Sequence, residues 1–250
     1  MFKKIIKNSL NFLGYEIIPK EFKDFYTEQN LDKIFRSLFR VRVKKLVIFD
    51  VGANRGQSIK RFRKIFSKAY MHCFEPIPRN YRYILKNYKN NMTFINNYAL
   101  GEKNGIKKFF INENSGTSSF FSINKKSNWA KKNKLNRTIK SENVKMTTLD
   151  NYVKKNKIKK IDILKIDVQG FEDKVLNGAK NLLRKNLIKT LEIELNFSDH
   201  YSNKLSFYDI EKYLTKNGYE LCAIKNTGWH FLDNSTTWFL DCIYKLKNFK

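Results

Sequence analysis

Short apolar segments and amphipathic segments alternate along the chain from residue 46 onward. Nearly continuous apolar runs, which are typical of strands buried on both faces, occupy residues 46–51, 70–75, 92–100, 161–167 and 190–197. Between them, apolar residues recur at helical spacing in residues 57–68, 78–88 and 172–185. Strands that alternate with helices predict βαβ units with right-handed crossovers, and hence a mostly parallel sheet with helices on its faces.

The N-terminal residues carry two amphipathic patterns and no strand-like run. The first pattern consists of Phe2, Ile5, Ile6, Leu10 and Leu13, with lysines and asparagines on the other face. The second consists of Leu31, Ile34, Phe35, Leu38 and Phe39. We therefore expect a helical extension over residues 1–45 and one domain over residues 46–250. A helix within residues 1–18 has two interpretations, peripheral contact with an anionic membrane or packing against the domain or a partner subunit.

Two regions interrupt the alternation of strands and helices. Residues 101–146 contain strand-like pieces at 107–111 and 118–123 and a stretch rich in Lys and Asn, which predict an insertion made of a hairpin and a basic loop. Further along, strand-like segments at 219–224 and 237–245 flank a turn-rich stretch. These segments predict a final pair of strands joined by a long turn.

The composition is that of a folded and strongly basic protein. Hydrophobic residues make up 42% of the 250 residues, which is more than disordered chains contain. The formal net charge of +27 attracts anionic lipids, acidic glycans, nucleotide-linked substrates or nucleic acid without specifying a fold. AT-rich coding, which favours Lys, Asn and Ile throughout a sequence, explains the charge equally well.

The cysteines and histidines indicate neither a disulfide framework nor a zinc site. Cys73, Cys222 and Cys242 are odd in number and widely spaced, which fits a reducing compartment. The histidines are scattered, so no group has the spacing of zinc ligands. Neither a signal peptide nor a membrane span is recognisable. We expect a cytoplasmic protein, which residues 1–18 can attach peripherally to the inner face of the membrane.

The strongest local motif is the stretch Asp50-Val-Gly-Ala-Asn-Arg-Gly56, which follows the first strand and opens a helix. Gly52 permits a tight turn, and Gly56 permits close approach by backbone or ligand. Asn54 stands where a dinucleotide-binding motif has its second glycine, and the motif of a phosphate-binding P-loop is absent. The stretch therefore predicts a cofactor loop of a different kind.

A second acid, Glu75, ends the next strand. Open parallel sheets bind ligands at the carboxyl ends of their strands, where Asp50 and Glu75 both lie. A carboxylate at this position accepts hydrogen bonds from both hydroxyls of a ribose. The alternative for both acids is capping of the helix that follows. Two acids at adjacent strand ends, one beside a glycine loop, favour a nucleoside ligand.

A series of short motifs extends over residues 46–198. They are Asp50-Val-Gly-Ala-Asn-Arg-Gly56, Phe74-Glu-Pro-Ile-Pro-Arg-Asn80, Asn97-Tyr-Ala-Leu-Gly101, Ser118-Ser119, Thr148-Leu-Asp150, Leu164-Lys-Ile-Asp-Val-Gln-Gly170, Val175-Leu-Asn-Gly-Ala179 and Glu192-Ile-Glu-Leu195. In this order they resemble the FkbM family of S-adenosylmethionine-dependent methyltransferases. Each motif alone is weak, whereas the ordered set is specific. Gln169 departs from the pattern, because many relatives carry Glu there.

The resemblance implies a Rossmann-like class I methyltransferase fold. This is an α/β fold with a mostly parallel seven-stranded sheet flanked by helices, here with the helical extension and with the insertion after the third strand. The resemblance also implies S-adenosylmethionine as cofactor, bound by Asp50, Gly52, Asn54, Gly56, Glu75, Asn97 and Leu100. By analogy the first loop borders the methionine part, Glu75 holds the ribose, and residues 97–100 lie against adenine. Similar proteins methylate hydroxyls of sugars and polyketides, many of them in the synthesis of bacterial surface polysaccharides.

Methyl transfer to a hydroxyl needs an acceptor held in line with the methyl group, and it gains from a base that removes the hydroxyl proton. Asp167, at the end of strand 161–167, is the first candidate for that base. Lys165 lies two residues earlier and therefore points to the same face of the sheet. The pair has two interpretations, orientation of the substrate and a structural ion pair.

Two further acids share one face of the strand over residues 190–197. Glu194 lies nearer the carboxyl end and is the third candidate catalytic residue, whereas we expect Glu192 to pair with a Lys or Arg. Asp167 and Glu194 are also the kind of oxygen ligand that binds a divalent cation. Because no further ligand can be named, a cation is compatible with the site but we predict no metal.

The remaining candidates concern the substrate. Ser118 and Ser119 in the insertion, and His200 after the strand, are assigned to substrate contacts, with His200 as a spare base. A turn explains the two serines equally well, and a surface position explains the histidine. Thr148 or Asp150 is expected to cap the next helix.

These residues predict an S-adenosylmethionine-dependent O-methyltransferase for a hydroxyl of a saccharide or related small molecule, in surface polysaccharide biosynthesis. One alternative, suggested by the charge, is a nucleic-acid methyltransferase acting on RNA. Against it, the motif used on exocyclic base amines is absent, and no separate RNA-binding module is visible. The other alternative is a non-catalytic cofactor-binding relative, which the intact Asp50, Glu75 and Asp167 disfavour. The acceptor and the oligomeric state stay open.

Overall fold

The computed structural model describes residues 31–39, 45–127, 137–197, 200–201, 206–229 and 237–249, with only the backbone at 226–229 and 237–238. Its centre is a seven-stranded sheet in the order β3-β2-β1-β7-β8-β10-β9. The parallel strands are β1 (Val47–Val51), β2 (Tyr70–Phe74), β3 (Thr93–Asn96), β7 (Ile161–Ile166) and β8 (Ile188–Asn196). β10 (Thr237–Leu246) lies antiparallel between β8 and β9 (Tyr219–Trp229). The predicted Rossmann-like α/β fold with a mostly parallel sheet is confirmed.

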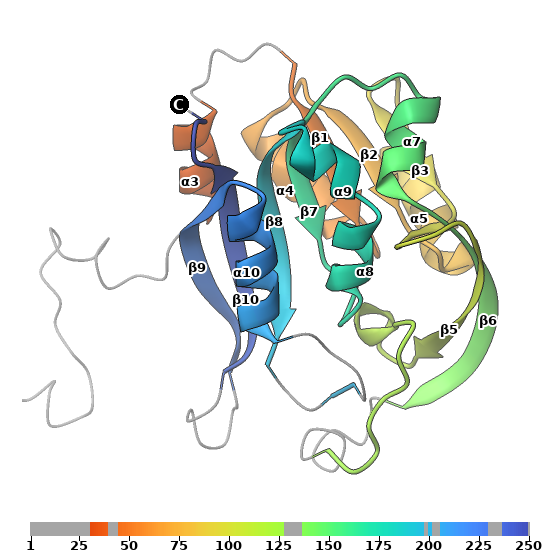
Figure 1. Cartoon of the computed structure of the whole chain (residues 1–250). Coiled ribbons are helices and arrows are strands. Elements are labelled where there is room, and N and C mark those ends of the chain that lie inside the picture. The colour runs from red at the N-terminus through yellow and green to blue at the C-terminus, as the bar shows by residue number, and fades with distance from the viewer. Residues whose placement is uncertain are drawn as a thin grey trace, which may run out of the picture. The chain divides into compact units, whose positions relative to one another are not determined.

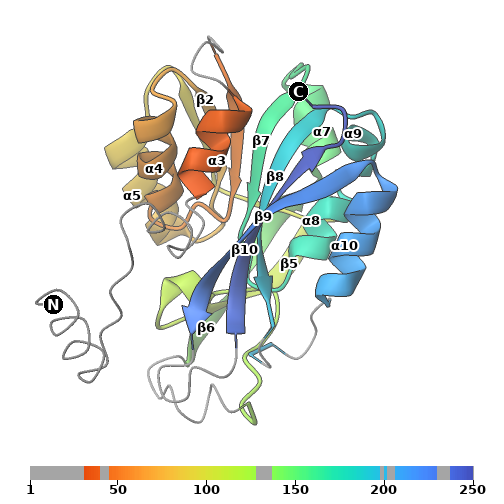
Figure 2. The same cartoon turned by 90° about the vertical axis from the view of Figure 1, so that its left-hand side faces the viewer.

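Helices cover both faces of this sheet (Figure 1). One face carries α3 (Leu31–Leu38), α4 (Gln57–Ile65) and α5 (Pro78–Tyr88). The other carries α7 (Leu149–Lys155), α8 (Glu172–Asn177), α9 (Lys180–Arg184) and α10 (Phe207–Lys216), and Figure 2 shows the two layers edge-on. No helix within the described ranges combines the length and the hydropathy that crossing a bilayer requires.

Alternation along the strands divides the core between these two faces. Ile48 of β1 and Ile163 of β7 pack on the side of α4 with Phe62. Phe49 and Leu164, one residue further along each strand, pack on the opposite side. Because neighbouring side chains point to opposite faces, a strand buried on both sides is apolar at almost every position. This is why the apolar runs in the sequence marked the strands.

The insertion forms a second, smaller sheet in the order β4-β6-β5. β5 (Gly105–Asn112) and β6 (Thr138–Thr147) pair as an antiparallel hairpin, with the short helix η2 (Ser115–Thr117) between them in sequence. A hairpin was expected here, but residues 118–123 contribute only isolated bridges to it and to Tyr201. The prediction of a single strand over 92–100 is wrong, because β4 (Ala99–Leu100) leaves the main sheet to pair with β6.

Helix boundaries differ from the expectation at two places. The helix predicted over 172–185 is divided into α8 and α9 at Gly178, where a Cβ atom would lie 2.0 Å from the carbonyl oxygen of Gly101. α10 was not predicted, although Ser206 and Asp209 form a capping box, with Ser206 Oγ accepting from Asp209 N at 3.3 Å.

The predicted cap after the insertion is confirmed for Thr148. Its Oγ1 accepts from Asn151 N at 3.1 Å and so caps α7. Asp150 has a different role, because its carboxylate accepts from the backbone N–H groups of Asn181 and Leu182 at 3.1 Å each. It therefore ties α7 to the start of α9.

The second amphipathic pattern near the N-terminus forms α3 as expected. Leu31 and Phe35 are buried, and they pack with Ile48 and Phe62 in one apolar cluster. The first pattern, and with it the membrane interpretation of residues 1–18, lies outside the described residues. The division at residue 46 stays a prediction.

Arg61 of α4 joins two elements that are far apart in sequence. Its Nε donates to Asp32 Oδ1 of α3 at 2.5 Å, and Nη1 and Nη2 donate to Glu192 Oε1 and Oε2 of β8 at 2.6 and 2.8 Å. The Glu192 side chain is 1% exposed. A buried carboxylate of this kind needs a charged partner, as the sequence analysis expected for Glu192.

We expect Arg61→Met to lower the free energy of unfolding by about 3 kcal/mol, because it leaves the buried Glu192 carboxylate without its partner. Urea unfolding followed by circular dichroism measures the change. The double variant Arg61→Met/Glu192→Met removes both charges and is expected to recover most of the loss. A single variant as stable as the unaltered protein would contradict this account of the pair.

Candidate active site

The loop after β1 lies directly against the end of β7. Gly52 has φ +92°, and a Cβ atom there would lie 1.9 Å from the carbonyl oxygen of Asp167. The N–H groups of Gly52 and Ala53 both donate to Phe74 O of β2 at 3.1 Å. Only glycine combines this conformation with this close approach. Gly52 therefore brings the ends of three neighbouring strands together.

Gly56 also has a positive φ, and a different neighbour requires glycine at this position. It precedes α4 with φ +82°, and a Cβ atom there would lie 2.6 Å from the ring of Tyr88. The close approach that the sequence suggested is thus made by an aromatic ring of α5. Contact of Gly56 with a cofactor stays a prediction.

Asn54 holds the loop to its surroundings. Its backbone N–H donates to Glu75 Oε2 at 2.8 Å, and its Oδ1 accepts from Asn80 Nδ2 at 2.9 Å and from Ser115 Oγ at 3.0 Å. Its φ of 46° is left-handed, a conformation that asparagine adopts more readily than most residues. One side chain thus connects the loop, α5 and the insertion.

Glu75 is buried at the end of β2. Its Oε1 accepts from Ile77 N at 2.9 Å, and its Oε2 accepts from Asn54 N. Burial raises the pKa of Glu75 to about 8, although these two backbone hydrogen bonds oppose the shift. Each carboxylate oxygen has a second lone pair, so the group can accept further hydrogen bonds.

Asp50 is fully buried at the end of β1, beside Lys165 in the strand register. Neither of its carboxylate oxygens has a hydrogen-bond partner among the described residues. Burial raises its pKa to about 6, while the Lys165 ammonium opposes the shift. Buried polar groups are nearly always satisfied, so this carboxyl calls for a donor from a ligand or from water.

A cavity opens between the strand ends and the insertion. It holds about 580 Å³ of empty space, counting open solvent at its mouth. Gly52, Glu75 and Asp167 line it on the side of the sheet, and Phe109 and Phe120 line it on the side of the insertion. Acids at one wall and aromatic rings at the other suit a ligand that has a polar and a flat apolar part.

The residues predicted for the adenine end have two different positions. Leu100 lines the cavity. The Asn97 side chain does not belong to that lining, and its Nδ2 instead donates to the carbonyl oxygens of Glu75 and Pro76 at 3.0 and 3.1 Å. Asn97 thus fixes the backbone that follows β2.

Asp167 is held from two sides at the edge of the cavity. Lys165 Nζ donates to its Oδ2 at 2.9 Å, and Gln169 Nε2 donates to its Oδ1 at 3.0 Å. Burial opposes ionisation of Asp167, but the Lys165 ammonium and these hydrogen bonds outweigh burial and lower its pKa. The two residues do share a face, as the alternation along the strand predicted.

Glu194 completes this group from β8. Its Oε2 accepts from Gln169 Nε2 at 2.5 Å, and burial together with the negative charge of Asp167 raises its pKa well above the usual range. The two carboxyls therefore differ, because the ionised form is favoured at Asp167 and disfavoured at Glu194.

Tyr201 is the member of this group that the sequence did not single out, and Gln169 was noted only for its departure from the FkbM pattern. Gln169 has a left-handed φ of 58°, and its Oε1 accepts from the hydroxyl of Tyr201 at 3.1 Å. Strained backbone of this kind is found at functional sites. The positive φ has no signature in the sequence, and Tyr201 reaches the group only through the tertiary fold.

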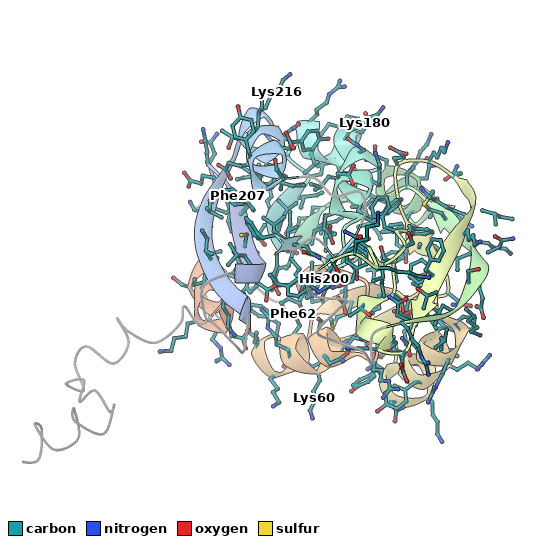
Figure 3. All side chains as sticks on the ribbon, turned by 90° about the horizontal axis from the view of Figure 1, so that it is seen from below. Lys60, Phe62, Lys180, His200, Phe207 and Lys216 are labelled. Carbon is teal, nitrogen blue, oxygen red and sulfur yellow. The ribbon has the colours of Figure 1, made fainter. Side chains whose placement is uncertain are left out.

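The three candidate substrate residues are not brought together. Ser118 lines the cavity, with its Oγ accepting from Asn112 N at 3.0 Å. Ser119 Oγ is buried and donates to Gln169 O at 2.8 Å, which supports the strained turn. His200 lies near the middle of the view from below (Figure 3), but it does not line the cavity, and its ring centroid lies 5.3 Å from that of Phe239. Substrate contact by these residues stays a prediction.

The described part of the chain contains no preformed set of ligands for a divalent cation. Within those residues, no three His, Cys, Asp or Glu side chains are arranged to hold a metal ion.

Comparison with protein families matches residues 50–221 to the methyltransferase FkbM domain. Among individual proteins, the chain is similar to the 2-O-methyltransferase NoeI of Sinorhizobium fredii (strain NBRC 101917 / NGR234), with 28% identity over 148 residues. The similar region covers 56% of this chain and 59% of NoeI, so it spans less than two thirds of that relative.

Solved structures with a similar course of the chain share little sequence with it. The METTL16 MTase domain has a TM-score of 0.48 and 10% identity, covering 94% of this chain and 75% of that one. A TehB-like SAM-dependent methyltransferase from Corynebacterium glutamicum has a TM-score of 0.42 and 9% identity, covering 91% and 94%. At this level of similarity neither structure bears on function.

We expect Gly52→Ala to lower the free energy of unfolding by about 3 kcal/mol, because the added methyl group overlaps the carbonyl oxygen of Asp167. Thermal or urea unfolding measures the loss. Gly218→Ala is the matched control, since Gly218 has a similar φ of +85° but nothing within 4 Å of the added atom. The control is expected to lose only about 1 kcal/mol from backbone strain. Equal losses would contradict the close approach at Gly52.

Proposed function

The chain belongs to the FkbM family of methyltransferases, and from this we propose that it transfers the methyl group of S-adenosylmethionine to a hydroxyl of a saccharide or related small molecule. The observation that carries the proposal is the position of Asp167. An ionised carboxylate, fixed by Lys165 and Gln169, lines the same cavity as the diol-binding candidate Glu75. A cofactor site and a base thus share one space.

The residues around the cavity fit the proposed cofactor. Glu75 has lone pairs left to accept the ribose hydroxyls. Asp50 is not part of the cavity lining, but it lacks a hydrogen-bond partner among the described residues, and the ammonium of the methionine part is a donor of the kind it requires. Leu100, Phe109 and Phe120 offer apolar surface to the adenine ring.

S-adenosylmethionine, when bound, supplies a methyl group on a positively charged sulfur. Asp167 accepts the proton of the acceptor hydroxyl as the oxygen attacks. Lys165 and Gln169 hold the two oxygens of Asp167, so that the carboxylate keeps one orientation and stays ionised. Burial and the negative charge of Asp167 raise the pKa of Glu194, which disfavours a second negative charge in the buried group.

The choice of a hydroxyl acceptor is supported by the similarity to NoeI, a 2-O-methyltransferase. The proposal also includes a role in surface polysaccharide biosynthesis. It further includes a cytoplasmic location, with peripheral membrane contact through residues 1–18. Mass spectrometry of surface glycans with and without the gene tests the role. Incubation with labelled S-adenosylmethionine and saccharide acceptors tests the chemistry, and methyl transfer only to amines or nucleobases would refute it.

We expect Asp167→Asn to lower kcat by about 10²- to 10⁴-fold, because the amide cannot accept the hydroxyl proton. The affinity for S-adenosylmethionine is expected to change less than about threefold, since an isosteric amide leaves the cavity in place. Single-turnover methyl transfer and calorimetry measure the two effects separately. Glu220→Gln, which removes an acid of a surface ion pair on β9, is the control and should leave both unchanged. Full turnover by the Asn variant would exclude Asp167 as the base.

The raised pKa of Glu75 predicts a proton release on cofactor binding. The carboxyl is half protonated at about pH 8 in the free protein, whereas a ribose diol binds best to the carboxylate. Affinity should therefore rise as the pH increases from 7 to 8 and level off above pH 8. Asp50, with a pKa of about 6, is already ionised in this range.

Calorimetry with 5′-methylthioadenosine in two buffers of different ionisation enthalpy measures the released proton. This probe has the diol but lacks the amino-acid part, so the ligand contributes no titration of its own near neutral pH. The 2′-deoxy analogue and the Glu75→Gln variant are the controls, and both should lose the pH dependence. Proton uptake by the unaltered protein would contradict the assignment of Glu75.

A further inference from the structure

A second groove adjoins the cavity that we assign to the cofactor. It holds about 1160 Å³ of empty space, counting open solvent, between the first turns of α4 and α5 and the β5–β6 hairpin. Asn54, Ile77 and Ser115 belong to the walls of both spaces. A single ligand can therefore extend from the groove past Asn54 into the cavity where Asp167 lies.

Three arginines give this groove its charge. Arg55 precedes α4, and Arg79 and Arg82 lie three residues apart on the first turns of α5. All three side chains are exposed, and none forms an ion pair with a residue that the structure describes. The two acids of the groove are already paired, Glu113 with Arg137 and Glu142 with Lys140.

The general basicity of the chain does not account for this cluster. The sequence contains 40 Lys but only 10 Arg, so the background charge is carried by lysine. Three of these few arginines nevertheless line one groove. Like charges at a spacing of three residues on a helix are destabilising, so the arrangement of Arg79 and Arg82 costs stability in the absence of a ligand. A bound anion offsets that cost.

Guanidinium groups identify the kind of anion. Arginine binds phosphate oxygens through two parallel hydrogen bonds, a geometry that lysine cannot reproduce. The amino ends of α4 and α5 add a favourable field for negative charge. Three unpaired positive charges match the two negative charges of a diphosphate diester better than the single charge of a sugar carboxylate.

We propose that this groove binds the diphosphate of an activated saccharide, so that the sugar attached to it reaches the cofactor cavity. The inference rests on the proposed function for the identity of the saccharide, but binding of the diphosphate can be tested without methyl transfer. Two sources share this chemistry, a nucleoside diphosphate sugar and a polyprenyl diphosphate sugar.

The test compares two variants that each remove three positive charges. Arg55→Gln/Arg79→Gln/Arg82→Gln alters the groove. Lys180→Gln/Lys185→Gln/Lys216→Gln alters exposed lysines of α9, of the residue that follows it and of α10. Lys180 and Lys216 lie on the opposite side of the molecule from Lys60 of α4, as Figure 3 shows. Calorimetry at fixed salt measures the binding of three ligands. They are inorganic pyrophosphate, a nucleoside diphosphate sugar, and a polyprenyl diphosphate sugar that is carried in micelles. Circular dichroism confirms that both variants fold.

We expect the arginine variant to bind pyrophosphate at least about 30-fold more weakly, and the lysine variant to change by less than about threefold. Affinity for S-adenosylmethionine should be unchanged in both. Tighter binding of one of the two diphosphate sugars, lost in the arginine variant, identifies the source. Arginine-dependent pyrophosphate binding without methyl transfer to any saccharide would support the groove while refuting the proposed function.

Three outcomes overturn the inference. Equal losses in the two variants would mean general attraction by a basic protein. A loss of S-adenosylmethionine affinity alone in the arginine variant would assign the groove to the carboxylate of the cofactor. RNA affinity that depends on the three arginines more strongly than pyrophosphate affinity does would assign it to a nucleic-acid backbone.

Discussion

The ionisation of the acids at the strand ends depends on two cations, the buried Lys165 and the half-buried Arg61. Arg61 binds Glu192 with two hydrogen bonds, which leaves the Lys165 ammonium to Asp167. Asp50, on the same face of the sheet, has no such partner, and burial raises its pKa to about 6. Of the two carboxyls that line the cavity, Asp167 and Glu75, Asp167 is therefore the one whose ionised form is favoured. The helix that follows the cofactor loop contributes to this balance, because Arg61 belongs to α4.

Much of the fold and part of the site follow from the sequence because they depend on local rules. Apolar runs mark strands that are buried on both faces, and the carboxyl ends of parallel strands meet at one edge, so Asp50, Glu75 and Asp167 had to lie near each other. The period of two along a strand placed Lys165 beside Asp167. A buried acid on β8 required a basic partner, although the sequence did not say that the partner is Arg61.

What the sequence left undecided depends on contacts between distant segments. Nothing local indicates that β4 leaves the main sheet for β6, that Tyr88 packs on Gly56, or that Tyr201 reaches Gln169. The left-handed backbone of Gln169 is held by tertiary contacts such as the hydrogen bond from Ser119, so the side chain alone does not reveal it. α10 is a different case, since the Ser206 and Asp209 of its capping box are a local pattern that the sequence does contain.

The position of β10 has a consequence for how the protein is made. β10 follows β9 in sequence but inserts between β8 and β9, with antiparallel neighbours on both sides. While the chain is being synthesised, the edge of β8 therefore stays unpaired until residues 237–246 have emerged. Pairing over such a sequence distance is slow, and a free strand edge invites association with other chains. In the finished sheet β10 pairs with β8, so this edge is no longer free.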